Sequence, residues 1–200
     1  MTIRELGLNI DLPVWEISSL VTDRQCIGPR MTQFQIGEKV VYPNHGIGTI
    51  ENISSRTFGS QFERFYLLRL TYKSMTVLVP FSHVTDIGLR RITKNGELSR
   101  VLYFLSEVDC SAKIDWKERF KEYSEKMNKG TLLEIAEVLK GLLVLQADKP
   151  LSFRDKKMLD RARHMLISEC AISRGMSERQ GTELLERALA KASLALPAPL

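Results

Sequence analysis

The sequence predicts an α+β fold, in which a small N-terminal β-barrel is followed by a C-terminal all-α bundle of about five helices. From residue 33 to about residue 89, short runs of β-branched and aromatic residues alternate with turn residues. From residue 95 onward, apolar residues recur at helical spacing. The chain has 200 residues and is 44% hydrophobic, which is enough for one or two domains with an ordinary core.

The first predicted strand pair has the clearest local pattern, because residues 39–50 read KVVYPNHGIGTI. Three strand-forming residues precede Pro43, which cannot donate into a central ladder and therefore ends the strand or confines it to an edge. Asn44 and the His-Gly pair after it have turn chemistry, and Gly48 permits a bulge or close packing. The segment predicts a strand, a tight turn and a second strand.

Further short strands and hairpin turns follow along this region. The strands are expected at residues 38–42, 48–55, 62–72 and 75–80, with turns at residues 59–60 and 73–74. About 55 residues bury little apolar surface unless their sheet curls on itself, so a small barrel is the expected form.

The C-terminal half predicts helices at residues 97–108, 115–129, 131–146, 152–174 and 177–194. Three of them open with a capping-box pair, namely Asp115 with Glu118, Thr131 with Glu134, and Ser152 with Asp155. Two glycines, Gly130 and Gly175, are placed to end helices. The helix at residues 131–146 is apolar over a wide face and is expected at the centre of the bundle.

These patterns divide the chain into a barrel domain at residues 31–93, a helical domain at residues 94–194 and a flexible tail at residues 195–200. Residues 1–30 have no clean period. They are interpreted as a poorly ordered extension, or as upstream sequence read from an early start codon with Met31 as the alternative start. The other interpretation is a short helix docked on the body through Val14, Trp15, Ile17, Leu20 and Val21.

Composition narrows the class of function. The net charge of +5 is modest for an autonomous DNA binder, so any nucleic-acid contact is expected from a folded patch. The three cysteines lack disulfide or metal spacing, which favours a reducing cytoplasm. Neither a transmembrane run nor a signal peptide is recognisable, so no membrane partner is expected. We find no phosphate loop, metal cluster or catalytic triad pattern, and therefore expect no cofactor and no enzymatic activity.

Three passages together resemble the CarD/CdnL family of bacterial transcription regulators. They are GEKVVYPNHG at residues 37–46, MTVLVP at residues 75–80, and DWKERFK at residues 115–121 with LSFRDKKMLDRAR at residues 151–163. The resemblance covers about residues 34–174 and implies a Tudor-like (SH3-like) barrel, similar to the RNA polymerase-interacting module of the transcription-repair coupling factor. It implies that the barrel binds the RNA polymerase β subunit and that the helical domain contacts promoter DNA without sequence specificity at the upstream edge of the bubble.

The same resemblance implies a non-enzymatic, monomeric cytoplasmic regulator that reaches the nucleoid through RNA polymerase and stabilises the open promoter complex. A protein–protein adaptor on polymerase without direct DNA contact is the alternative.

Trp116 matches a family position at which a tryptophan wedges into the minor groove where the duplex opens. Such a wedge substitutes for lost base stacking. The alternative is that Trp116, Phe120, Tyr123 and Met127 form an ordinary core stripe, because their spacing is i, i+4, i+7 and i+11. The first turn of the helix, however, allows Trp116 to project past the domain edge.

Basic residues near Trp116 and on the following helices are predicted to contact phosphates. They are Lys113, Lys117, Arg119, Lys121, Arg154, Lys156, Lys157, Arg161 and Arg163. Interleaved acidic residues support the alternative of a solvated helix face. Glu118 stands where some family members have a basic residue, which is expected to weaken DNA contact.

On the barrel, Arg56 matches a family position that contacts polymerase, with a solvent-exposed turn arginine as the alternative. A second contact position, basic in parts of the family, is Leu78 here, which implies a more apolar contact. Met75, Val77 and Val79 complete the predicted polymerase-binding strand. His45 has no nucleophile or carboxylate at motif spacing and carries no catalytic signal.

Overall fold

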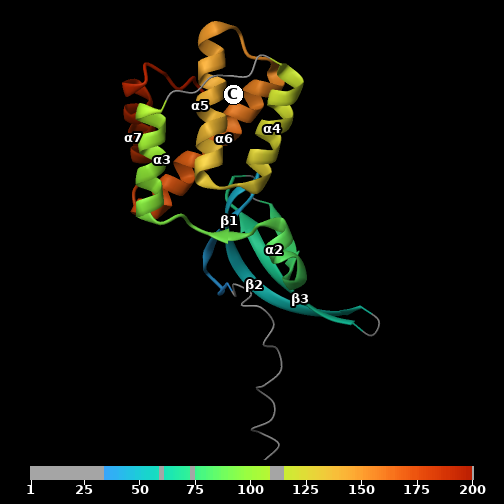
Figure 1. Cartoon of the computed structure of the whole chain (residues 1–200). Helices are drawn as coiled ribbons and strands as arrows, with labels where there is room; N and C mark the ends of the chain where they lie inside the picture. The colour runs from blue at the N-terminus through green and yellow to red at the C-terminus, as the bar shows by residue number, and fades with distance from the viewer. Residues whose placement is uncertain (1–33, 59–60, 73–74, 109–114, 200) are drawn as a thin grey trace, which may run out of the picture. The chain divides into compact units, whose positions relative to one another are not determined.

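The computed structural model describes residues 34–58, 61–72, 75–108 and 115–199 and confirms the α+β fold (Figure 1). An antiparallel sheet has the order β4-β3-β2-β1-β5. Its strands are β1 (Lys39–Tyr42), β2 (Gly46–Phe58), β3 (Gln61–Leu70), β4 (Thr76–Pro80) and β5 (Arg90–Arg91). The predictions for residues 1–30, for Lys113 and for the turns at residues 59–60 and 73–74 lie outside the described residues.

The β2–β3 hairpin extends further than its residue preferences predict. Its pairing continues to Phe58 opposite Gln61, because antiparallel partners satisfy each other's backbone groups even where the side chains are polar. The register shifts between Ile50 and Asn52, so the bulge lies after Gly48 rather than at it. Gly48 has the predicted close packing, since a Cβ there would lie 2.7 Å from a methyl carbon of Leu68.

One face of the sheet carries a compact apolar core. Ile50, Tyr66, Leu68 and Val79 are at most 1% exposed. The Tyr66 hydroxyl accepts a hydrogen bond from the backbone N–H of Phe34 at 3.1 Å. Its ring stacks on that of Phe81, with 4.1 Å between the ring centres. On β3 and β4 the inner face is therefore buried and the outer face is more exposed, whereas Val40 and Val41 on β1 are both buried.

A short 3-10 helix, η2 (Phe81–His83), the four-residue helix α2 (Val84–Ile87) and β5 connect the sheet to the helical part. The sequence pattern predicts none of the three, because two to four residues are too few to establish a period.

Five helices follow, as predicted: α3 (Asn95–Glu107), α4 (Trp116–Lys129), α5 (Leu132–Asp148), α6 (Phe153–Arg174) and α7 (Glu178–Lys191). The apolar helix α5 packs against α3, α4 and α6, which confirms its central place. The Thr131 and Ser152 hydroxyls cap α5 and α6 by accepting from backbone N–H groups. Asp115 caps α4 by accepting from the N–H of Lys117, one residue before the predicted partner Glu118.

A buried lysine closes the end of α3. Lys140, on α5, is 2% exposed, and its ammonium donates to the carbonyl oxygens of Phe104, Leu105 and Val108 at 3.1, 2.8 and 2.5 Å. These carbonyls belong to the last turn of α3 and to its C-cap residue Val108, where a helix leaves acceptors unsatisfied and where positive charge is favourable. Among the described helices, none is long and apolar enough to cross a membrane.

Candidate polymerase and nucleic-acid interfaces

The outer face of the sheet brings together the two predicted polymerase-contacting positions. Arg56 on β2 pairs with Glu63 on β3, and Leu78 on β4 pairs with Leu67 on β3. Glu63 and Leu67 are four residues apart on one strand, so their side chains point to the same face at a separation of roughly 13 Å. Arg56 is exposed and Leu78 is 42% exposed. Both side chains are therefore available on one surface.

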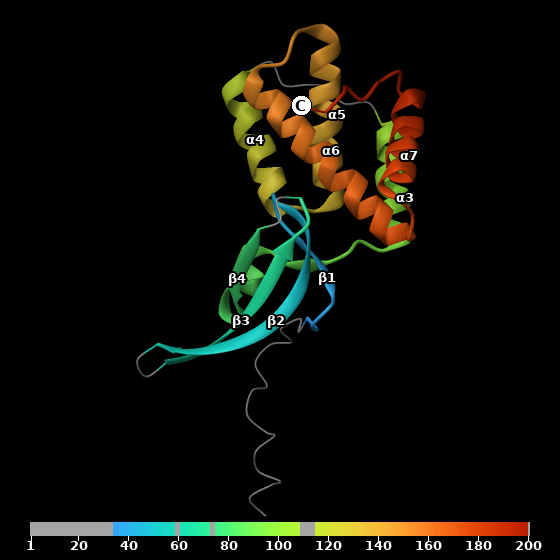
Figure 2. The same ribbon diagram turned by 180° about the vertical axis from the view of Figure 1, so that it is seen from behind.

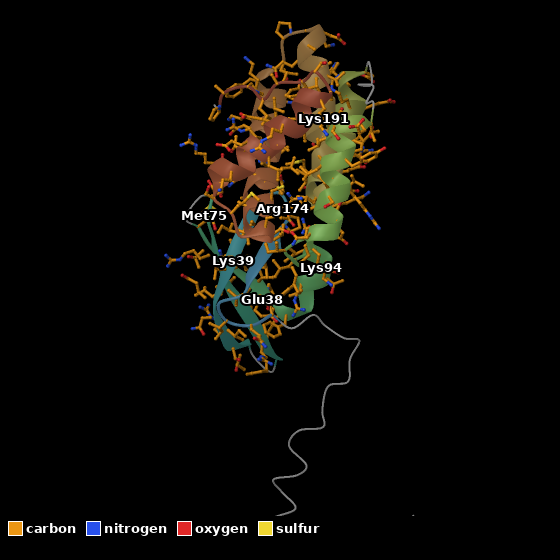
Figure 3. All side chains as sticks on the ribbon, turned by 90° about the vertical axis from the view of Figure 1, so that its left-hand side faces the viewer. Glu38, Lys39, Met75, Lys94, Arg174 and Lys191 are labelled. Carbon is orange, nitrogen blue, oxygen red and sulfur yellow. The ribbon has the colours of Figure 1, made fainter. Side chains whose placement is uncertain are left out.

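The strand β4 lies at the edge of the sheet, so its outer side is a place where another strand can pair. Met75, which directly precedes β4, and Leu78 are exposed, and Figure 3 shows Met75 near the end of the sheet that lies next to the helices. Val77 is half-buried and Val79 is fully buried, since both point to the inner face. Leu78 and Met75 can contact a partner through their side chains, whereas Val79 can do so only through its backbone.

The turn at residues 43–46 packs against the helical domain. Pro43 lies against Gly130 at the end of α4, where an added Cβ would be only 3.0 Å from that of the proline. The Asn44 side chain accepts a hydrogen bond from Arg161 on α6 at 2.7 Å and donates one to Asn128 on α4 at 3.2 Å. The family-signature turn therefore connects the sheet to α4 and α6.

A buried ion pair forms a second connection. Arg90 of β5 binds the Glu169 carboxylate of α6 through both terminal nitrogens, at 2.6 and 2.9 Å. The same guanidinium donates to the Gly130 carbonyl, and Glu169 also accepts from the N–H and hydroxyl of Thr93. Glu169 is 1% exposed, so its charge is compensated entirely within the protein.

An aromatic contact supplements these two connections. The ring of Tyr72, two residues after β3, lies 4.1 Å from the His164 ring of α6, measured between ring centres. Burial lowers the pKa of His164, so the neutral imidazole is favoured in the folded protein.

The helices α4 and α6 form the second candidate surface, and its clearest residue is Trp116. Tyr123 and Met127, further along α4, are buried, but Trp116 is 57% exposed. Trp116 is the first residue of α4 and projects beyond the core, as the first-turn interpretation predicts. The alternative in which Trp116 belongs to the core is therefore wrong.

Some of the predicted basic residues line a groove between α4 and α6. Arg154, Lys157 and Arg161 recur at i, i+3 and i+7, so they share the face of α6 that looks toward α4. Phe120 and Arg154 also line the adjoining hollow that holds Trp116. Figure 2 shows the two helices side by side over this length. We call this surface the α4–α6 groove, and define it by Trp116, Phe120, Phe153, Arg154, Lys157 and Arg161.

Four other predicted basic residues are absent from the described residues that line the groove, namely Lys117, Lys121, Lys156 and Arg163. Lys117 and Lys121 are exposed on α4, and the Lys117 ammonium is 5.7 Å from the centre of the Trp116 ring. Lys156 and Arg163 line a different depression, where Arg163 donates to the Pro197 carbonyl and to Asp160.

Arg119 is an internal residue rather than a surface one. It is 3% exposed, and its Nη2 atom lies 3.8 Å from the Asp155 carboxylate. Burial prevents direct contact with a phosphate, and Arg119 instead ties α4 to the start of α6. The predicted contact was wrong in this respect because charge on a helix does not reveal a buried partner on another helix.

Sequence reasoning also missed Phe153, which is 67% exposed at the start of α6 and lines the same hollow as Trp116. Its signal in the sequence was its place in the first turn of a predicted helix, the same place that Trp116 has in its own helix.

The structure thus combines a five-stranded antiparallel sheet with a helical part that carries an exposed tryptophan. Residues 34–93 match the family described as "CarD-like/TRCF RID domain", and residues 100–186 match "CarD, C-terminal domain". The chain therefore belongs to the CarD/CdnL family, a family of transcription factors rather than of known enzymes. Both matches indicate a transcription factor that interacts with RNA polymerase.

Two relatives are similar to this chain. YdeB of Bacillus subtilis (strain 168), described as a candidate transcription factor, is 34% identical over 147 residues, which cover 74% of this chain and 96% of YdeB. The solved structure titled "CdnLNt from Myxoccoccus xanthus" is 35% identical, covers 32% of this chain and 92% of its own, and has a TM-score of 0.27.

Proposed function

We propose that this protein binds the RNA polymerase β subunit through the outer face and β4 edge of its sheet, and that it stabilises the open promoter complex by contacting DNA at the upstream edge of the bubble. The observation that carries the proposal is Trp116, an aromatic side chain 57% exposed at the mouth of a groove with basic walls. In this proposal the protein is found with the nucleoid because polymerase carries it there.

The arrangement suits a factor that is tethered to polymerase. An apolar side chain at a disrupted base step replaces lost stacking and slows closure of the duplex. The modest net charge of +5 is sufficient, because a tether of matched length gives an effective concentration of about mM. The cations of the groove supply phosphate contacts that are independent of sequence.

Two substitutions test the two halves of the proposal separately. Trp116→Ala should shorten the open-complex lifetime by roughly ten-fold, since a stacking contact of about 1.4 kcal/mol is lost, while binding to the β subunit stays unchanged. Arg56→Glu should weaken binding to the isolated β lobe and leave the fold intact, because Arg56 is exposed. Undiminished promoter kinetics in the first variant would overturn the wedge, and undiminished binding in the second would overturn the Arg56 contact.

An adaptor that docks on polymerase without touching DNA is the competing function. It is favoured by the exposed aromatics Trp116 and Phe153, because aromatic side chains also dominate protein–protein hot spots. The adaptor predicts that Trp116→Ala lowers affinity for polymerase, whereas the DNA wedge predicts a change in open-complex lifetime alone.

A further inference from the structure

Phe153 is an exposed aromatic side chain that has no role in the DNA contact proposed above. It is the first residue of α6 and is 67% exposed, more than Trp116. Phe153 and Trp116 line the same hollow of about 550 Å³, together with Phe120, Pro150 and Arg154. Sites for small ligands commonly have volumes of about 300–1,000 Å³, so this hollow is large enough for a single base.

The two aromatic residues come from corresponding places in two helices. Each is the first residue of its helix, after the caps Asp115 and Ser152. Figures 1 and 2 both show α4 and α6 starting side by side, at the end of the helical part that lies away from the sheet. The pair is therefore built on two helices that both pack against α5, rather than on a loop.

The charges around the pair favour a nucleic acid. The Lys157 ammonium lies 4.5 Å from the centre of the Phe153 ring, and the Lys117 ammonium lies 5.7 Å from that of Trp116. Lys149 and Arg154 also line the hollow. Aromatic rings beside cations are the usual combination for binding single-stranded nucleic acid, in which bases stack and phosphates pair with the charges.

Asp155 is the one carboxylate among the described residues that line the hollow, and the exposed Asp115 accepts a hydrogen bond from the Lys117 N–H at the start of α4. Asp155 is 8% exposed, accepts a hydrogen bond from the Ser152 hydroxyl and lies beside Arg119, so its charge is compensated inside the protein. Glu118 is exposed, but it is two residues from Trp116 and therefore points to another side of α4. It is absent from the described residues that line the hollow.

We propose that Trp116 and Phe153 form a two-residue aromatic site that takes up one unstacked nucleobase at the edge of the opened promoter DNA. This inference rests on the DNA contact proposed above and adds a second stacking residue to it. The site recognises an unpaired base through its π-face, so it tolerates any of the four bases. Holding that base out of the stack opposes closure of the duplex.

The first experiment measures open-complex lifetime with the full chain and RNA polymerase. Phe153→Ala should shorten the lifetime by about ten-fold, as expected for loss of one base–aromatic stack, and Phe153→Tyr should retain it. Tyr103→Ala is the matched control, because Tyr103 is a 64% exposed aromatic on α3 that does not line the hollow. An unchanged lifetime for Phe153→Ala would overturn the site, as would an equal loss for Tyr103→Ala.

The second experiment separates this inference from the wedge itself. A 5-iododeoxyuridine, placed in turn at each position of the upstream bubble edge, is irradiated in the polymerase complex, and the crosslinked peptides are sequenced. One position that crosslinks to both Trp116 and Phe153 supports the site. Crosslinks to Trp116 alone overturn the site and leave the proposed function standing, whereas crosslinks to neither residue overturn both.

Discussion

The outer face of the sheet and the α4–α6 groove are two candidate binding surfaces with different chemistry. The sheet presents an edge strand with exposed Leu78 and Met75, which suits pairing with another protein's strand. The groove presents exposed Trp116 and Phe153 between cationic side chains, which suits a charged polymer with planar bases. The comparison shows two surfaces of different chemistry on two parts of one small chain, and the Asn44 contacts and the Arg90–Glu169 pair connect these parts.

The largest expected effect concerns the Arg90–Glu169 ion pair, which connects the sheet to α6. Glu169→Ala leaves Arg90 without its buried partner, and breaking a buried ion pair costs about 3–5 kcal/mol of unfolding free energy. Urea titration followed by circular dichroism measures this loss. Arg179→Ala is the control, since the Arg179 pair with Glu183 is exposed and contributes less than about 1 kcal/mol. An equal loss of unfolding free energy in the two variants would mean that the Arg90–Glu169 pair does not stabilise the contact between the sheet and α6.

The next effect tests the apolar character of the sheet surface. Leu78→Glu should weaken binding to the β subunit by roughly ten-fold or more, because burying a leucine side chain is worth about 1.5–3 kcal/mol. The isolated β lobe in a calorimetric titration gives the affinity. Leu133→Glu is the matched control, because Leu133 on α5 is 43% exposed, close to the 42% of Leu78. An equal loss of affinity in Leu78→Glu and Leu133→Glu would contradict the assignment of the β subunit to the sheet surface.

A smaller effect tests which side of α6 faces DNA. Lys156 and Lys157 are neighbours in the sequence, but only Lys157 lines the α4–α6 groove. Losing one phosphate contact should reduce the salt slope of DNA binding by about 0.9, or roughly three-fold in affinity over a four-fold change in salt. Lys157→Gln should show this change at a forked promoter with polymerase, and Lys156→Gln should not. A change in Lys156→Gln alone would assign DNA to the other side of the helix.

The smallest effect concerns pH and the His164 ring of α6. Burial lowers the pKa of His164 below its usual value of 6.5, so the unfolded chain takes up a proton at a higher pH than the folded protein does. The stability that the neutral His164 ring contributes to the folded protein is therefore fully present above pH 6.5. This stability is lost as the pH falls through the lowered pKa. The Tm of thermal unfolding should change less between pH 7.5 and pH 5.5 in His164→Gln than in the original protein. An unchanged difference would show that other groups set the pH dependence.

Much of the architecture followed from the sequence because the signals are local. Capping residues such as Ser152, the helix-ending Gly130 and Gly175, and the wide apolar face of α5 depend on residues within one or two turns of each other. The first-turn position of Trp116 likewise predicted a side chain that could escape the core. The short elements η2, α2 and β5 were missed because two to four residues establish no period, and β5 in addition pairs with the distant strand β1.

By itself the sequence determined the order of the longer strands and helices, the family and the residue types at both candidate surfaces. Only the tertiary structure decided which of those residues reach the surface, because a side chain's exposure depends on what another helix or strand places over it. In the tertiary structure Arg119 is buried beside Asp155, and Lys156 and Lys157 line different depressions. The signature residues at 43–46 contact α4 and α6. Phe153 and Trp116 line the same hollow, although 37 positions separate them in the sequence, because α4 and α6 start side by side.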